Sequence, residues 1–244
     1  MANVFVEEAT LKSIADSIRN KTGKTEAMLP NEMPAEIESI ETGDGGVGFE
    51  TYANSIQFAN LNLFGKEELT LNLDNAITLN NVCRSYSAEN DNTTVKHLTI
   101  NCLLPVTNIS NMILATSGDN VLERITFNVD TSEVTSTTYS FARLKALKII
   151  DGTPLDFSEA TSISSATFST VALEEIRFAP KSIFVNFPFS TSAVLSNESI
   201  QSVIDGLADL TGKATQTLDL HSNVINKLTD EQWLQIGNKN WSAT

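Results

Sequence analysis

LTLNL (69–73), LTINC (98–102) and ITFNV (125–129) are three copies of one pattern, apolar–Thr–apolar–Asn–apolar. Weaker copies follow as LKIID (147–151), IRFAP (176–180) and LDLHS (218–222). Successive copies start 29, 27, 22, 29 and 42 residues apart. Repetition at intervals of twenty-odd residues is typical of proteins that stack one unit on the next. The copies therefore predict an α/β repeat fold, in which parallel strands stack as a solenoid of leucine-rich-repeat type.

Alternation along each strand places its first, third and fifth side chains in a shared core and the other two on the outer face. The second positions form an outer row of Thr70, Thr99, Thr126, Lys148, Arg177 and Asp219. The fourth positions form a neighbouring row of Asn72, Asn101, Asn128, Ile150, Ala179 and His221. Either these rows are structural, with stacked polar side chains bonded between strands, or they form a platform for a glycan or protein. The candidate binding surface consists of both rows without Ile150 and Ala179, and Lys148 and Arg177 stand out on it because the chain is acidic.

The N-terminal part, residues 1–41, has a helical pattern. Thr10 can cap a helix whose apolar face includes Leu11, Ile14 and Ile18, and a shorter element after Pro34 carries Ile37 and Ile40. Four glycines then fall within residues 42–49, which predicts a flexible linker. The repeats occupy residues 50–244.

From about residue 196 the pattern changes to a helical cap. Ser196 or Asn197 can begin a helix that Gly212 would end. Thr229 and Gln232 form a capping-box pattern for a final helix. Solenoids need an atypical end to close the core, so we expect this segment to be that closing cap. Trp233 and Trp241 are expected to pin it to the core.

Composition narrows the choice of partners. The 244 residues include 16 basic and 30 acidic side chains, a formal net charge of −14, so nucleic acid and anionic membrane are not expected as partners. Glu7 and Glu8 interrupt the apolar stretch that a signal peptide needs, so we expect synthesis in the cytoplasm without secretion. Cys83 and Cys102 are 19 residues apart with no CxxC spacing and are expected to be buried thiols.

Residue types suited to catalysis are sparse. The two histidines, His97 and His221, have no G-x-S-x-G motif to accompany them. The doublets Glu67–Glu68 and Glu174–Glu175 could supply paired carboxylates for glycan hydrolysis, but such doublets are usually solvated turn residues. We therefore expect no enzyme activity, no cofactor and no metal site.

Three stretches resemble known proteins. TLKSIADSIRNKTGKTEAMLPNEMPAEIESI is similar to a short N-terminal module of tail and baseplate proteins from phages of Gram-positive bacteria. The repeats resemble those of BspA-type leucine-rich repeat proteins, with Phe141 ahead of Leu144 and Phe168 ahead of Leu173. The stretch from SIQSVIDGLADL to the C-terminus looks like the end of leucine-rich proteins encoded in such phages and prophages.

These resemblances imply a virion structural protein of the phage tail or baseplate. Residues 1–41 would attach it to other tail proteins through Leu11, Ile14, Ile18, Ile37 and Ile40, and the resemblance leaves a homo-oligomer such as a trimer open. The solenoid would face a host surface glycan or protein, or another tail protein. Two alternatives stand beside this interpretation: a BspA-type surface adhesin outside the virion, and a cell-envelope glycan hydrolase.

Overall fold

The computed structural model describes residues 15–16, 66–73, 76–84, 92–115, 120–164 and 167–244. The chain separates into two compact units, Met1–Gly48 and Phe49–Thr244. In the first unit only Ala15 and Asp16 are described; both are helical, and Ala15 is buried. Outside the described residues lie Leu11, Ile14, Ile18, Ile37, Ile40 and the glycine-rich segment 42–49.

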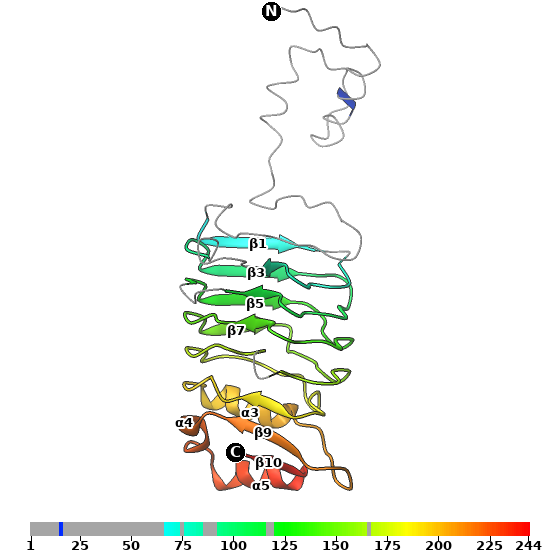
Figure 1. Cartoon of the computed structure of the whole chain (residues 1–244), viewed down its shortest axis with the longest axis vertical. Helices are drawn as coiled ribbons and strands as arrows, with labels where there is room; N and C mark the ends of the chain where they lie inside the picture. The colour runs from blue at the N-terminus through cyan, green and yellow to red at the C-terminus, as the bar shows by residue number, and fades with distance from the viewer. Residues whose placement is uncertain (1–14, 17–65, 74–75, 85–91, 116–119, 165–166) are drawn as a thin grey trace, which may run out of the picture. The chain divides into compact units, whose positions relative to one another are not determined.

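Four strands of the second unit form a parallel sheet in chain order (Figure 1). They are β1 (Glu68–Asn72), β3 (His97–Asn101), β5 (Arg124–Asn128) and β7 (Ile149–Gly152). Each strand pairs with the next so that equivalent positions of the repeat lie side by side: Leu69, Leu98, Ile125 and Ile150 form one row. The segment 174–179 follows β7 through two isolated parallel bridges, Ile149 with Glu175 and Leu155 with Phe178.

The pattern of buried and exposed side chains in each strand follows the alternation of apolar and polar residues in its sequence. In β1, Leu69 and Leu71 are buried while Thr70 is half-buried and Asn72 is exposed, and β3 and β5 repeat this order with Asn101 half-buried. Each buried Leu, Ile or Phe contributes about 1.5–3 kcal/mol relative to its exposed state. A slip of one residue would turn these side chains to solvent, so hydrophobic burial specifies the register.

The fourth copy of the repeat is shifted by three residues from its predicted place. Ile150 takes the first apolar position of β7 and is buried, and Asp151 pairs with Thr126. The prediction that Ile150 faces outward was therefore wrong. Leu147 instead lies three residues before the first apolar position, Ile150, as Leu122 lies before Ile125, and both leucines are fully buried. With the register of the structure, the copies at 69, 98, 125, 150 and 176 are 29, 27, 25 and 26 residues apart.

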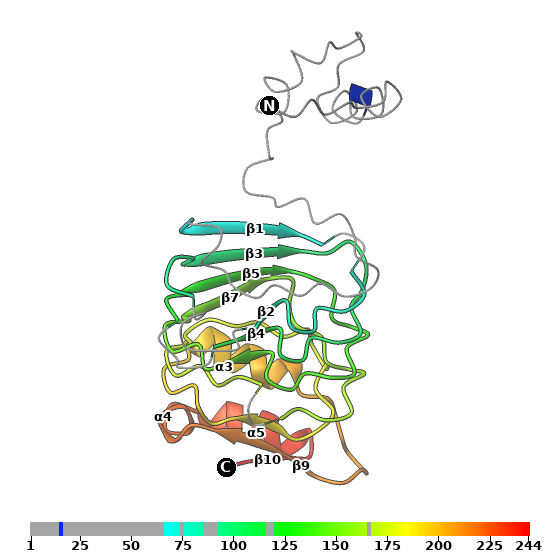
Figure 2. The ribbon, with the colours of Figure 1, turned by 45° about the horizontal axis from the view of Figure 1, so that its top comes forward.

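A second parallel sheet covers the other side of the core. It is made of β2 (Cys83–Arg84), β4 (Ile113–Leu114) and β6 (Phe141–Ala142), again in chain order, and Figure 2 shows β2 and β4 away from the first sheet. Later in the chain the core contains a cluster of phenylalanine rings around Phe168. The centroid of the Phe168 ring lies 5.6 Å from that of Phe141 and 5.0 Å from that of Phe189. Cys83 is buried, which raises the pKa of its thiol, and Cys102 is partly buried; both are free thiols.

The C-terminal part adds helices and a third parallel sheet. Its elements are β8 (Phe187–Phe189), α3 (Asn197–Gly206), β9 (Gln216–Leu220), α4 (Ser222–Ile225), α5 (Asp230–Asn238) and β10 (Trp241–Ala243). The sheet order is β10-β9-β8. The copy LDLHS (218–222) was predicted to extend the first sheet, and this was wrong: Leu218 pairs with Phe187 on one side and Ala243 on the other.

The helix starts predicted at Ser196 and Thr229 are confirmed. The Ser196 side chain accepts a hydrogen bond from Ser199 N at the start of α3, and Thr229 and Gln232 form a complete capping box at α5. The end of α3 was predicted at Gly212 but falls at Gly206. Leu207 is already extended and bridges Ile183, which draws the chain out of the helix.

Side-chain hydrogen bonds join α3 to the segment after it. Gln201 Nε2 donates to Gln235 Oε1 over 2.9 Å. Lys239 Nζ donates to Ile204 O (2.6 Å), and Trp241 Nε1 donates to the carbonyl of Ala208 (2.9 Å). Trp241 is buried as predicted, whereas Trp233 is 40% exposed, so its predicted role in pinning the segment was wrong. Among the described residues, no helix is long and apolar enough to cross a membrane.

Candidate functional site

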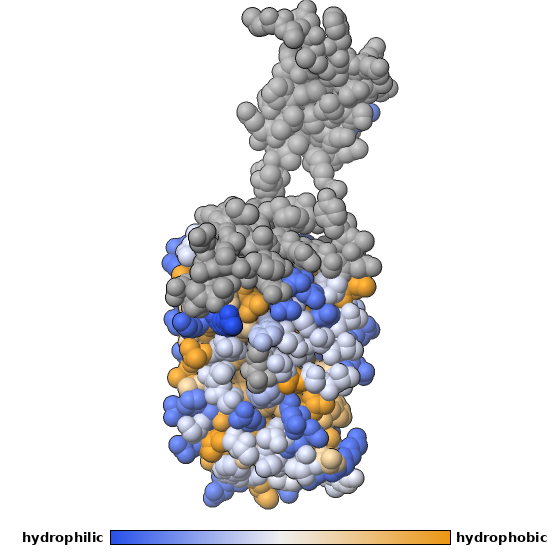
Figure 3. Space-filling model, viewed as in Figure 1, coloured by the Kyte–Doolittle hydropathy of each residue, from blue (hydrophilic) through white to orange (hydrophobic). Residues whose placement is uncertain are grey.

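Two rows of polar side chains cross the outer face of the first sheet. In-register pairing aligns Thr70 with Thr99 and Thr126, and Asn72 with Asn101 and Asn128. The coloured surface in Figure 3 is mostly hydrophilic or intermediate, with hydrophobic side chains in separate spots. The sheet therefore presents polar groups of one kind at regular intervals.

The asparagine row is a chain of side-chain hydrogen bonds. Asn101 Nδ2 donates to Asn72 Oδ1 over 2.7 Å, and Asn128 Nδ2 donates to Asn101 Oδ1 over 2.9 Å. The interpretation that stacked polar side chains bond between strands is thus confirmed. Each amide has two N–H donors and two acceptor lone pairs, so Asn101 keeps one N–H and one lone pair for another molecule. The row is fixed in orientation and still able to bind.

The asparagine row ends at β5, because the register that pairs Phe127 with Gly152 places Thr153 and no asparagine at the next position. Gly152 pairs with Phe127 and has a φ of +98°, a conformation that L side chains rarely adopt. A Cβ at this position would lie 2.7 Å from Phe127 O and 2.8 Å from Asn128 Oδ1. The Gly152 backbone therefore lies too close to β5 for any side chain at this position.

Lys148 was predicted in the threonine row and belongs elsewhere. The shifted register places it two residues before the first apolar position of its strand, in a charge column of Glu67, Lys96, Glu123, Lys148 and Glu174. Charges alternate along this column: Lys96 Nζ lies 2.8 Å from Glu67 Oε1, and Lys148 Nζ lies 3.2 Å from Glu123 Oε2. The hydrogen bond and charge of Lys96 lower the pKa of Glu67. Lys148 is an ion-pair partner within the stack.

Asp219 and His221 also lie away from the predicted rows, because β9 belongs to the third sheet. Asp219 Oδ2 accepts a hydrogen bond from Ser190 Oγ over 2.9 Å, and His221 Nδ1 accepts one from Asn223 N at the start of α4. Both side chains thus have local structural partners. Of the predicted surface, the structure brings together the Thr and Asn rows and Arg177.

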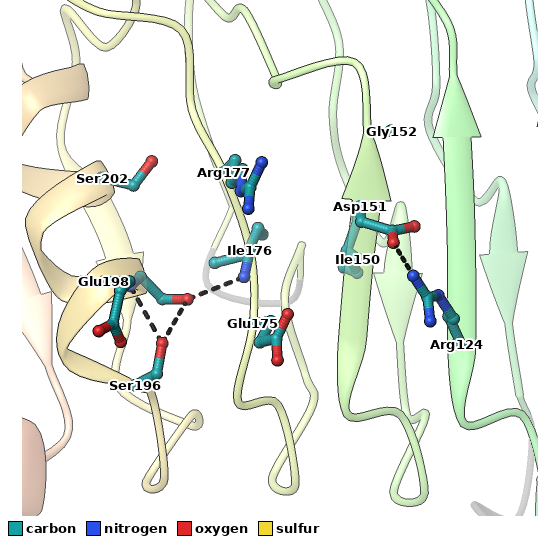
Figure 4. Close-up of a pocket in the computed structure, with 11 residues that line it drawn as sticks. Arg124, Ile150, Asp151, Gly152, Glu175, Ile176, Arg177, Ser196, Glu198 and Ser202 are labelled. Carbon is teal, nitrogen blue, oxygen red and sulfur yellow. Dashed lines mark hydrogen bonds and ion pairs between the residues drawn. The ribbon is translucent and has the colours of Figure 1, made fainter.

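Arg177 lines a groove between β7 and α3 that encloses about 550 Å³. The lining residues are Arg124, Ile150, Asp151, Gly152, Glu175, Ile176, Arg177, Ser196, Glu198, Ser199 and Ser202. Figure 4 shows Glu175 and Arg177 on the segment between β7 and α3, with Ser196, Glu198 and Ser202 on the helix side. The groove therefore runs from Asp151 and Gly152 on β7 to the first turns of the helix.

The change from strand to helix creates this groove. Ile176 N donates to Ser199 Oγ (3.0 Å) and Phe178 N donates to Ser202 Oγ (2.9 Å), so serine hydroxyls take the place that carbonyls of another strand would have. Neighbouring strands lie about 4.8 Å apart, whereas a helix packs about 10 Å from its neighbour. The extra separation leaves a trough over the outer side of segment 174–179.

An ion pair fixes one wall of the groove. Arg124 Nη2 donates to Asp151 Oδ2 from the adjacent strand (Figure 4). Partial burial of Asp151 opposes its ionisation, but hydrogen bonds from Arg124 and Thr126 and the charges of Arg124 and Arg177 outweigh it, so the pKa of Asp151 is lowered. The Asp151 hydrogen bond and charge raise the pKa of Arg124 in turn. Both groups are charged at neutral pH and held in place.

The charges of the groove suit binding better than proton transfer. A carboxyl that protonates a glycosidic oxygen needs a raised pKa, and that of Asp151 is lowered. Glu67 has a lowered pKa as well and is paired with Lys96. Within the described part of the chain, no cluster of three His, Cys, Asp or Glu side chains could hold a metal ion.

Comparisons with protein-family models, curated proteins and solved structures find no match to this chain. The function is therefore argued from the outer face of the sheet and the groove beside it.

Several groove residues were not predicted from the sequence. Arg124, Asp151, Glu198 and Ser202 were missed. Arg177 was predicted on the binding surface, and Glu175 was named only as half of a carboxylate doublet. Asp151 was missed because the predicted register of the fourth repeat was wrong by three residues. The residues of α3 were missed because the segment from residue 196 was predicted to be a cap and not a neighbour of the sheet face. The uniform spacing of 25 to 29 residues, or the alternating charges of the charge column, would have placed Asp151 correctly.

Proposed function

We propose that this chain is a structural protein of a bacteriophage tail or baseplate that displays a binding surface. Its residues 50–244 would form a leucine-rich-repeat-like solenoid, and its outer sheet face and groove would contact a host surface molecule or another tail protein. Residues 1–41 would attach the chain to the tail.

The in-register stack is the observation that carries the proposal. Strands at intervals of 25 to 29 residues each bond to the next in the chain, as expected when every repeat contacts mainly its neighbours. The outer face of such a stack is broad and rigid, because its polar side chains are bonded to one another. Rigid presentation lowers the entropic cost of binding.

The helical segment supports the idea of a closing cap. Ser199 and Ser202 of α3 accept hydrogen bonds from the last strand-like segment, so its backbone N–H groups are satisfied without a further strand. Closing an edge in this way prevents pairing with other chains. The similarity of the N-terminal stretch to phage tail modules supplies the biological setting.

The proposal is tested by binding of the labelled full chain to host cells. Thr99→Arg places a long charged side chain on the outer face of β3, and Thr161→Arg makes the same change at an exposed position outside the three sheets. We expect Thr99→Arg to weaken cell binding roughly tenfold while Thr161→Arg leaves it unchanged, since blocking an interface centre costs about 1.4 kcal/mol or more. Equal binding by both variants, each with unchanged circular dichroism, would exclude this face as the binding surface.

A further inference from the structure

We infer that the groove between β7 and α3 binds a neutral polyhydroxylated ligand, of the size of one or two sugar rings. This inference deepens the proposed function. It rests on that function only in taking the sugar to be part of a surface glycan that the protein contacts. The inference stands on the volume of the groove, the mixture of its charges and the hydrogen-bonding groups that its own ion pair leaves open.

The size and rigidity of the groove suit a small ligand. Its volume of about 550 Å³ lies within the roughly 300–1,000 Å³ typical of small-molecule sites. Gly152 lines the groove and contributes no side chain, because a Cβ there would lie 2.7 Å from Phe127 O. On the helix side, Ser199 and Ser202 are fixed by the bonds that they accept from Ile176 N and Phe178 N. The walls are formed before any ligand binds.

The charges of the groove are mixed, with a small negative excess that disfavours anions most. Arg124 and Arg177 contribute two positive charges against the three negative charges of Asp151, Glu175 and Glu198. An anion would meet three carboxylates and a chain of net charge −14, while a cation would meet two guanidinium groups. A neutral polyol avoids both penalties, because each hydroxyl can donate to a carboxylate and accept from a guanidinium.

Several charged groups of the groove are left open to the hydroxyls of a ligand. Arg124 uses Nη2 for Asp151, which leaves its other N–H donors available in a fixed orientation. Among the described residues, no side chain hydrogen-bonds to the guanidinium of Arg177 or to the carboxylates of Glu175 and Glu198. Donors and acceptors thus alternate across the groove, and neighbouring hydroxyls on a sugar ring offer the complementary alternation.

The affinity of one groove should be low. None of the eleven lining residues is aromatic, so the stacking that strengthens many sugar sites is missing here. Exposed polar contacts alone give a Kd on the order of 1 mM, which corresponds to about −4 kcal/mol. Several copies displayed together would raise the effective affinity.

Saturation-transfer NMR on the full chain tests this inference with five probes of defined charge. They are the neutral methyl glycosides of glucose, galactose and N-acetylglucosamine, the anion glucuronate and the cation glucosamine. We expect saturable transfer to at least one neutral glycoside and weaker transfer to both charged sugars. Arg177→Gln and Glu175→Gln should each weaken it roughly tenfold, the effect of losing one charged hydrogen-bonding partner.

Matched controls make the same chemical changes away from the groove, at the exposed residues Arg143 and Glu133. Arg143→Gln and Glu133→Gln should bind like the wild type. Stronger binding of a charged sugar, equal loss in controls and groove variants, or no saturable transfer from any neutral glycoside would each overturn the inference. Host-cell binding that persists without sugar binding would refute only this inference, and sugar binding by a chain missing from virions would refute only the phage setting.

Discussion

Gly152→Ala is expected to destabilise the second unit far more than Gly212→Ala, although both glycines have positive φ. At Gly152 φ is +98° and at Gly212 it is +78°, so an L residue is strained at each. Such strain costs about 1–2 kcal/mol. The two sites differ in space: a Cβ at 152 would lie 2.7 Å from Phe127 O, whereas nothing lies within 4 Å at 212.

The contact at Gly152 adds a second penalty. Phe127 O accepts the hydrogen bond from Thr153 N over 2.9 Å, so moving this oxygen weakens a bond that joins β5 to the chain after β7. Loss of that bond adds about 0.5–1.5 kcal/mol, which brings Gly152→Ala to about 1.5–3.5 kcal/mol and leaves Gly212→Ala at about 1–2 kcal/mol.

Urea unfolding followed by circular dichroism measures both variants, and a fall in the midpoint with an unchanged slope reports stability alone. In thermal unfolding, Gly152→Ala should lower Tm by roughly 3–14 °C at 2–4 °C per kcal/mol. Equal destabilisation by the two substitutions would refute the register that places Gly152 beside Phe127.

Four other substitutions test separate parts of the structure. Lys148→Glu should destabilise by about 0.5–1 kcal/mol in urea unfolding at low salt, because it faces Glu123 and Glu174, while Lys145→Glu should have no effect. Phe168→Ala should lose about 3–5 kcal/mol and the exposed Phe184→Ala less than 1 kcal/mol. Lys239→Met removes the ammonium that donates to Ile204 O and Leu207 O and should cost about 1–3 kcal/mol, unlike Lys213→Met. Because the pKa of Asp151 is lowered in the folded state, its ionisation stabilises the fold at pH values above the ordinary carboxyl pKa of about 4. This stabilisation is lost as pH falls through the pKa of the folded state. Asp151→Asn should therefore reduce stability at pH 7 and flatten the acid limb of the stability profile, which is its fall in stability at low pH. An unchanged acid limb in that variant would contradict the role of the Arg124–Asp151 pair.

The strands could be predicted wherever the repeat pattern is strong. LTLNL, LTINC and ITFNV align without gaps, and their burial follows from alternation alone. The register of the fourth copy was predicted wrongly because LKIID contains the apolar residues Leu147, Ile149 and Ile150. Either Leu147 or Ile150 can take the first apolar position of the strand. Only the pairing partners decide between them: Ile150 fits the core beside Ile125, and Leu147 fits the preceding turn.

The third sheet and the groove could not be predicted in the same way. LDLHS has the correct alternation for a strand, but alternation does not tell which strand is its neighbour. The pairing of Leu218 with Phe187 depends on the course of the chain between them, which includes α3. The groove arises where α3 replaces a strand, and its hydrogen bonds from Ile176 N and Phe178 N to serine hydroxyls join residues more than twenty positions apart. Helix caps, by contrast, depend on local sequence, and the caps of α3 at Ser196 and of α5 at Thr229 were both predicted.

Immunogold electron microscopy of phage particles from the strain that encodes this chain tests the central claim most directly. The antibody is raised against the full chain, and particles from a deletion strain serve as the control. The account predicts gold at the tail tip or baseplate, lost in the deletion strain. Bare particles from a culture that expresses the chain would contradict it, and would favour the adhesin alternative outside the virion.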